Sequence, residues 1–223
     1  EVQATISLTS QSSFRLVNSK FPPVTLFDDV LDAEDFDTAF ALQALTNPRI
    51  LNELGDINLV SMDEIPFGID GVNYATAPFT HVNPEGSRFS DGSFGVLYVA
   101  STVETAIAET RYHQERYFRN VEGLNFDTID MRCLRVQFTA ELVDAINIRD
   151  IHAPEDYSHS RVFGAHIKNA GLPGVQYRSV RNEGNTCWGL MSPRYVESVI
   201  QTQHFEYVYD GRRIIKVREL TLN

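Results

Sequence analysis

Residues 86–117, GSRFSDGSFGVLYVASTVETAIAETRYHQERY, decide the expected fold because they join a turn, a short apolar run and a long amphipathic segment. The apolar run GVLYVA, residues 95–100, is typical of a short β-strand. The SDGS before it predicts a turn that folds residues 86–90 back against this strand. Such a hairpin would place Arg88 and Tyr98 about opposite each other.

A helix is expected directly after the strand. Ser101 and Glu104 have the S-x-x-E spacing of a capping box, in which each side chain satisfies an amide that the start of a helix leaves unpaired. The helix would extend from about Thr102 to Tyr117.

Polar residues on this helix recur at intervals of four and three, which places them on one stripe: Thr105, Glu109, His113 and Arg116. A polar stripe alone usually faces solvent. Here the preceding strand brings a cation and an aromatic ring to the same end of the helix. We therefore expect Arg88, Tyr98 and Glu109 to converge on one cleft.

The rest of the chain predicts a mixture of helices and strands. Residues 132–139 alternate in polarity as a half-buried strand does, and further short strands are expected at 196–200, 205–209 and 213–218. Short helices are expected after the acidic segment 28–37 and at 48–55, whereas 61–86 is expected to be rich in loops. Because strands and helices do not alternate regularly, the fold class is α+β.

The composition narrows the classes of protein. The chain has 223 residues, of which 43% are hydrophobic, and this suffices for one sizeable core. Its formal charge of −11 argues against direct binding of nucleic acid, which requires Lys and Arg at the phosphates. We find no secretory signal at residues 1–13 and no apolar run long enough to span a bilayer, so a soluble, cytoplasmic protein with no membrane partner is expected.

Several classes of site have no support in the sequence. The chain has no nucleotide-binding P-loop, no G-x-G-x-x-G fingerprint and no H-E-x-x-H zinc motif. Cys133 and Cys187 lie far apart without a C-x-x-C pair or a nearby His, so we interpret them as buried free thiols and expect no metal. A hydrolase built on Ser179 would lack the usual G-x-S-x-G context.

Four ordered blocks of the sequence resemble a RES domain, whose name refers to its Arg, Glu and Ser. The central block is residues 80–117, where the matching residues are Arg88 and Glu109, and a later block, GVQYRSVRNEGNTCWGL, supplies Ser179. The blocks FRLVNSKFPPVTLFDDV and LTNPRILNELGDI extend the similarity towards the N-terminus. The chain resembles the longer form of the family: one RES domain over 1–223, with 1–75 as an N-terminal elaboration packed on the core.

The resemblance implies a fold related to the diphtheria-toxin type of ADP-ribosyltransferase, with a short-stranded β core and flanking helices. It also implies a toxin of a toxin–antitoxin system that depletes NAD⁺. The reaction would be phosphorolysis or hydrolysis of the nicotinamide–ribose bond, with NAD⁺ as substrate, inorganic phosphate as a possible co-substrate and no cofactor. The implied partner is an antitoxin with a helix-turn-helix DNA-binding part that covers the active site.

The same resemblance suggests a role for each candidate site residue. Glu109 would stabilise the oxocarbenium-like transition state, as a carboxylate does in glycoside hydrolysis. Arg88 and Arg15 would bind the pyrophosphate, because a guanidinium matches its geometry. Tyr98 would stack against the positively charged nicotinamide ring.

Three further residues are expected to bind substrate. Ser179 would form a hydrogen bond with the nicotinamide amide or a phosphate. His113, one turn after Glu109, would orient that carboxylate or bind a phosphate, and Arg181 would contribute to a phosphate pocket. Arg178 stands where the family pattern has a proline before the serine.

Two other functions remain open. The first is a mono-ADP-ribosyltransferase, which would attach the ADP-ribosyl group to a protein, because phosphate, water and a side chain differ only in what fits the far side of the ribose. The second is a catalytically silent binding module whose acidic segment, residues 28–37, docks a basic partner. Incubation with NAD⁺ separates these functions.

Overall fold

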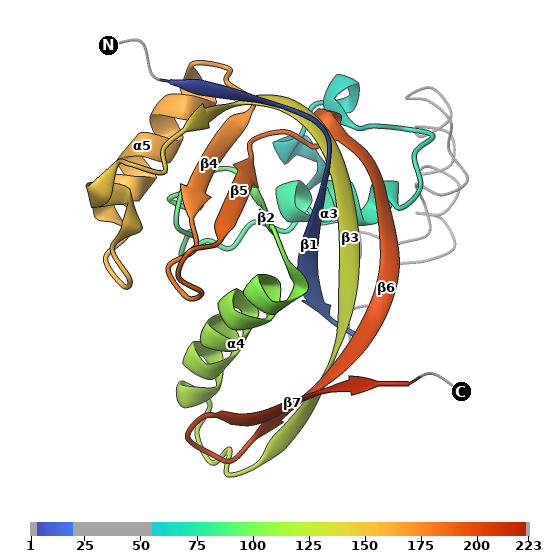
Figure 1. Cartoon of the computed structure of the whole chain (residues 1–223), viewed down its shortest axis with the longest axis vertical. Coiled ribbons are helices and arrows are strands. Elements are labelled where there is room, and N and C mark those ends of the chain that lie inside the picture. The colour runs from blue at the N-terminus through green and yellow to red at the C-terminus, as the bar shows by residue number, and fades with distance from the viewer. Residues whose placement is uncertain (1–3, 20–54, 222–223) are drawn as a thin grey trace.

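The computed structural model describes residues 4–19 and 55–221, which form a mixed α/β structure (Figure 1). The strands of this part are β1 (Thr5–Asn18), β2 (Leu97–Ala100), β3 (Asp127–Asp144), β4 (Gly174–Arg178), β5 (Thr186–Leu190), β6 (Val196–Tyr209) and β7 (Ile214–Leu220). Its α-helices are α3 (Val72–Thr80), α4 (Val103–Arg119) and α5 (Ser158–Asn169). Short 3-10 helices are η1 (Ile57–Leu59), η2 (Met62–Glu64), η3 (Arg149–His152) and η4 (Pro193–Tyr195). The helices expected within residues 28–54 lie outside the described residues.

The strands form one sheet in the order β1-β2-β5-β4-β3-β6-β7, and β1 also pairs with β3. The first five of these strands therefore form a closed circuit. All pairings are antiparallel except that between β3 and β4. The mixture of strands and helices without regular alternation agrees with the mixed class predicted from the sequence.

The expectation of a short-stranded β core is wrong. Strands β1, β3 and β6 have 14, 18 and 14 residues, and they run side by side as long curved ribbons (Figure 1). The segments 196–200 and 205–209 belong to one strand, because the pairing shifts register between Arg132 and Leu134 where the polar residues of β6 intervene. There Thr202 donates a hydrogen bond to the carbonyl of Cys133 (3.2 Å). A β-bulge thus absorbs the polar interruption that predicted a strand end.

Two hydrophobic clusters lie on opposite faces of the sheet, because successive strand residues point to opposite sides. Leu134, Val136 and Phe138 of β3 belong to the cluster with α3, whereas Met131 and Cys133 belong to the cluster with α4. The same alternation in β2, β4 and β5 directs three side chains towards α4: Tyr98, Tyr177 and Cys187. This face of the sheet carries the site described below.

Helix α3 lies in the stretch that was expected to be rich in loops. Its residues Val72, Ala75 and Phe79 are buried in the first cluster, which offsets the cost of Pro78 inside the helix. The N-cap of the helix is Gly71, which has a φ of 71° and lies so close to β6 that a Cβ atom would meet a backbone carbonyl. Packing therefore overrides the local breaker signals.

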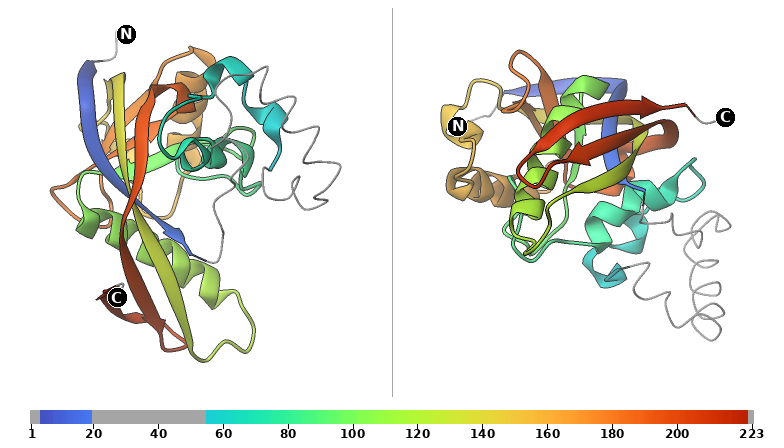
Figure 2. Two further views of the ribbon diagram at one scale, coloured as in Figure 1. Left: turned by 90° about the vertical axis from the view of Figure 1, so that its right-hand side faces the viewer. Right: turned by 90° about the horizontal axis from the view of Figure 1, so that it is seen from below.

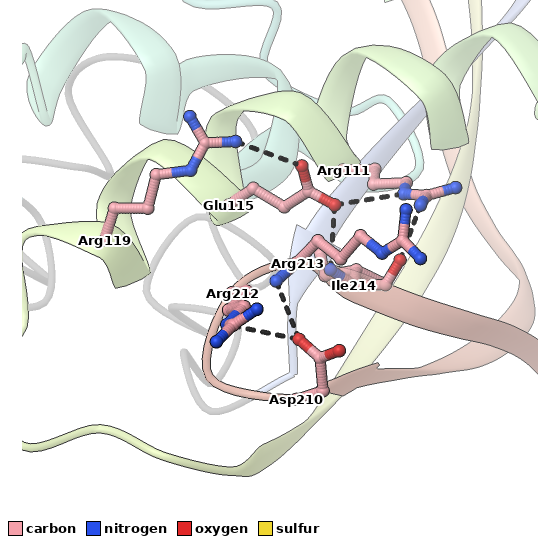
Figure 3. A network of polar contacts seen from close by, with 7 residues as sticks. All are labelled: Arg111, Glu115, Arg119, Asp210, Arg212, Arg213 and Ile214. Carbon is pink, nitrogen blue, oxygen red and sulfur yellow. Dashed lines mark hydrogen bonds and ion pairs between the residues drawn. The ribbon is translucent and has the colours of Figure 1, made fainter.

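Helix α4 covers the predicted range but begins one residue later than the capping box implied. Thr102 is the N-cap, and its side chain accepts a hydrogen bond from the amide of Thr105. At the far end of the helix, Glu115 accepts a hydrogen bond from the amide of Ile214 (2.8 Å), and Arg111 donates to the carbonyl of the same residue (Figure 3). These contacts fix α4 to the start of β7, where the β6–β7 hairpin extends away from the other strands together with the start of β3, which pairs with β6 (Figure 2).

Cys133 and Cys187 are buried free thiols, as predicted. Within residues 4–19 and 55–221, no helix is long and apolar enough to cross a membrane.

Candidate functional site

A cavity of about 230 Å³ opens between α4 and the sheet. Five of the residues predicted from the sequence line it together: Arg15, Arg88, Tyr98, Glu109 and His113. The remaining wall is mostly apolar and comprises Phe14, Leu16, Val99, Ala100, Ala106, Thr110, Tyr177 and Cys187. The cavity thus combines a few charged and polar side chains with a mostly apolar wall, which is the usual composition of a site for a small molecule.

The hairpin expected to place Arg88 opposite Tyr98 does not form. Residues 86–90 are not a strand, and β2 pairs instead with β5 and, at one position, with β1. Both side chains still line one cavity, because the Tyr98 hydroxyl accepts a hydrogen bond from the amide of Phe89 (2.9 Å) and contacts the Ser87 hydroxyl (2.8 Å), on either side of Arg88. Burial raises the pKa of Tyr98 to about 12, although both contacts lower it. The neutral phenol therefore fixes the loop that carries Arg88.

Arg88 is buried, with 8% of its surface exposed. Its Nη1 donates to the carbonyls of Ile151 and Ala153, both at 3.0 Å, and its guanidinium lies 4.6 Å from the centroid of the Tyr157 ring. These neighbours are neutral, so they orient the cation and leave its charge uncompensated.

Arg15 reaches the same cavity from β1. Its Nη1 donates to the backbone carbonyl of Tyr98 (3.1 Å). This hydrogen bond links β1 to β2, which pair with each other only at Phe14 and Ala100. Burial lowers the pKa of Arg15, and Tyr98 acts in the opposite direction. An arginine remains a cation under such a shift, because its ordinary pKa lies far above neutral pH.

Glu109 is oriented from outside α4 by Ser179. The Ser179 hydroxyl donates to Oε1 of Glu109 (2.7 Å) and accepts hydrogen bonds from the amides of Arg181 (3.2 Å) and Asn182 (3.0 Å). Ser179 is buried, with 6% of its surface exposed, and it is not part of the cavity wall. Its hydroxyl thus forms hydrogen bonds with both the Glu109 carboxylate and the backbone of the turn after β4.

His113 lies one turn after Glu109, with part of its side chain open to solvent. Desolvation lowers the pKa of His113, whereas Glu109 raises it. Arg181 does not line the cavity. Its guanidinium lies 3.3 Å from the centroid of the Tyr112 ring and donates to the carbonyl of Pro154, so it fixes the turn beside α4.

Sequence reasoning missed several residues that build the site. Tyr177 and Cys187 line the cavity from β4 and β5, where strand alternation directs them to the face of α4. Burial raises the pKa of Cys187 to about 12, which leaves a neutral thiol. Asn182 donates to the Thr105 hydroxyl (2.9 Å) and ties the turn to the start of α4. Residues 4–19 and 55–221 contain no group of His, Cys, Asp and Glu suited to a metal ion.

The arrangement can bind an anionic ligand and orient a second part of it against a carboxylate. Arg15 and Arg88 supply donors with fork geometry, and Glu109 supplies an acceptor held by a hydrogen bond from outside the cavity. The fold and this cavity define a mixed α/β protein with a candidate ligand-binding cleft between a helix and a sheet.

The chain belongs to the RES domain family, which matches residues 65–210. It is 27% identical over 202 residues to an uncharacterised protein of Sinorhizobium fredii, y4oC, and the alignment covers 90% of this chain and 84% of that protein. Among solved structures, a chain of the MbcT–MbcA toxin–antitoxin complex of M. tuberculosis is similar with a TM-score of 0.37 and 10% identity, over 53% of this chain and 73% of that one.

Proposed function

We propose that this protein cleaves NAD⁺ at the bond between nicotinamide and ribose. One observation carries the proposal: Ser179 holds Glu109 in a cavity that Arg15, Arg88 and Tyr98 also line. Membership of the RES family supports it as well. We also propose that the fold is related to the diphtheria-toxin type of ADP-ribosyltransferase.

Glu109 is proposed as the residue that stabilises the transition state. Loss of nicotinamide leaves positive charge on the ribose, and a carboxylate close to that carbon stabilises the charge and holds a ribose hydroxyl. Because Ser179 donates to one carboxylate oxygen, the other remains for the substrate. We therefore assign Ser179 to the orientation of Glu109 instead of direct contact with nicotinamide.

The two arginines are proposed to bind the pyrophosphate. A second cavity, of about 140 Å³, shares Arg15 and Tyr98 with the first. A dinucleotide needs more room than the first cavity offers, since sites for drug-sized ligands measure roughly 300–1,000 Å³. A substrate that spans both cavities would pass its phosphates across Arg15, with the Tyr98 ring beside the nicotinamide.

The biological role proposed is that of a cytoplasmic toxin that depletes NAD⁺ and is held inactive by an antitoxin with a helix-turn-helix part. Transfer of an ADP-ribosyl group involves no net electron transfer, so the proposed reaction needs no redox cofactor, and we propose that it needs no metal. Phosphate or water would be the acceptor. His113 lines the cavity and is exposed to solvent, so we propose that a small acceptor enters beside it.

The test is to incubate the purified protein with NAD⁺, with and without inorganic phosphate, and to identify the products by chromatography and mass. Phosphate-dependent formation of ADP-ribose-1″-phosphate indicates phosphorolysis, and free ADP-ribose indicates hydrolysis. Label transferred to added protein would indicate a mono-ADP-ribosyltransferase. If NAD⁺ is untouched under every condition, including with candidate acceptor proteins, the enzymatic proposal is wrong and a binding module takes its place.

A further inference from the structure

His152 connects two segments that hold side chains of the cavity. Its Nδ1 lies 2.7 Å from the carbonyl oxygen of Ile148, and its Nε2 lies 3.0 Å from the backbone nitrogen of Arg178. The amide of Arg178 can only donate, so Nε2 accepts and Nδ1 carries the proton that is donated to Ile148. Both ring nitrogens are engaged, and the geometry specifies one neutral tautomer.

The residues that flank His152 and the residue that bonds its Nε2 are connected to the side chains of the cavity. Arg178 is the last residue of β4 and directly precedes Ser179, whose hydroxyl orients Glu109. Ile151 and Ala153, the residues on either side of His152, supply the two carbonyls that orient Arg88. The imidazole therefore connects the segment that orients Glu109 to the segment that orients Arg88.

The charges around His152 disfavour its protonated form. Arg178 and Arg88 act from β4 and from the loop before β2, and the ring of Tyr177 lies 6.4 Å away. Arg149 and Asp150 lie on η3 itself. Burial lowers the pKa of His152, the hydrogen bond to Ile148 opposes this, and both arginines lower it further.

We propose that His152 is a positioning residue whose neutral imidazole keeps Glu109 and Arg88 in place, and that its protonation releases the turn after β4 and switches the site off. A proton on Nε2 would face the amide proton of Arg178, and the hydrogen bond between them would be lost. The inference rests on the proposed NAD⁺ cleavage for its kinetic consequences. Its structural consequence is independent of any substrate.

The kinetic test compares His152→Gln and His152→Ala with wild type. A glutamine oxygen can accept from Arg178 and does not titrate, so His152→Gln should keep kcat at neutral pH within about threefold. In a plot of kcat against pH, His152→Gln should also lack the part of the decline at acidic pH that is caused by protonation of His152. His152→Ala should lower kcat by about 10- to 100-fold with a smaller change in KM, because a misplacement of about 1 Å costs up to that factor. His166→Gln, at an exposed position of α5, is the matched control.

The structural test uses the intact protein without substrate. The ring nitrogens of His152 and the backbone amides of Arg178 and Ser179 are followed by NMR from about pH 8 to pH 5, the range in which histidine titrates. The two amide signals should move with the titration of His152 in wild type and should stay in place in His152→Gln.

The outcomes separate the two proposals. If the amides of Arg178 and Ser179 ignore the titration of His152, or if His152→Gln keeps the whole acid limb of the wild-type profile, the inference is overturned. If wild type consumes no NAD⁺ at any pH while the amides follow His152, the proposed reaction fails and the positioning role stands. Thermal melts of each variant ensure that a loss of kcat reflects the site and not unfolding.

Discussion

The hydroxyl oxygen of Ser179 lies 2.7 Å from Oε1 of Glu109 and joins the turn after β4 to the middle of α4. The two residues are 70 positions apart in the chain. The serine gives its one proton to the carboxylate and accepts two backbone amides, so its hydrogen-bonding capacity is used. The orientation of Glu109 therefore depends on where the turn places Ser179.

Replacement of Glu109 by Gln tests the carboxylate itself. The amide oxygen of Gln can still accept from Ser179, so the free energy of unfolding should change little. The negative charge is lost, and kcat for nicotinamide release should fall by about 10²- to 10³-fold, as happens when one stabilising group of a transition state is removed. Glu104→Gln, at an exposed position in the first turn of α4, should leave kcat unchanged. Unchanged turnover in Glu109→Gln would contradict the assignment.

Ser179→Ala tests the orientation of Glu109. The change leaves two backbone amides without their acceptor, which should cost about 1–3 kcal/mol in the free energy of unfolding, measured with urea. The loss of the donor to Glu109 should also lower kcat by about tenfold or more.

Asn182→Ala is the matched control for Ser179→Ala, since Asn182 anchors the same turn through Thr105 and does not contact Glu109. It should lower stability and keep kcat within about threefold of wild type. If both variants lose kcat equally, the loss is caused by disorder of the whole turn and not by the missing hydrogen bond from Ser179 to Glu109.

The sequence predicted helix α4 and the convergence of Arg88, Tyr98 and Glu109 on one cavity, because helical periodicity and a short apolar run are local signals. It placed Arg88 on a hairpin that does not form. The hydrogen bonds that orient Arg88 reach residues 63 and 65 positions further along the chain, and no local pattern encodes such contacts.

Two other expectations show the same limit. Arg181 was expected to bind phosphate, yet in the fold it stacks on Tyr112, which the helix presents from another part of the chain. The polar stretch near Thr202 predicted a strand end, but a bulge opposite Cys133 lets β6 continue. A contact between a turn and a helix decided the first feature and strand pairing the second, and one sequence gives neither tertiary contacts nor register.

Tyr98→Phe tests the hydroxyl that holds the loop of Arg88. The change leaves the buried amide of Phe89 without its acceptor and should cost about 1–3 kcal/mol in the free energy of unfolding. Because the ring remains while the loop loosens, KM for NAD⁺ should rise more than kcat falls. Steady-state kinetics and urea unfolding measure both effects. Tyr117→Phe, at an exposed position of α4, should change neither.

Stability should fall as the solution is acidified below neutral pH. Desolvation lowers the pKa values of His113 and His152 in the fold from their usual 6.5, and nearby arginines lower them as well. Between 6.5 and the folded pKa, the unfolded chain therefore binds protons that the folded protein does not, and the free energy of unfolding decreases as the pH falls through this window. These two groups contribute their full stabilisation above it.

Urea midpoints measured in small pH steps check this dependence. His113→Gln should make the slope shallower in that window, because one of the two depressed groups is removed, whereas His166→Gln should leave it unchanged. A midpoint that stays constant from pH 7 to pH 5, or an identical slope in His113→Gln, would speak against these shifts.

Arg15 and Arg88 are held by backbone carbonyls, and within residues 4–19 and 55–221 neither forms an ion pair. The cavity holds these two cations and one carboxylate, Glu109, so it has an excess of positive charge inside a protein whose formal charge is −11. An anionic ligand is repelled by the distant field and attracted only at short range. Because salt screens exposed charges over roughly 10 Å but buried ones far less, added salt should speed the encounter with an anion, the reverse of ordinary electrostatic steering.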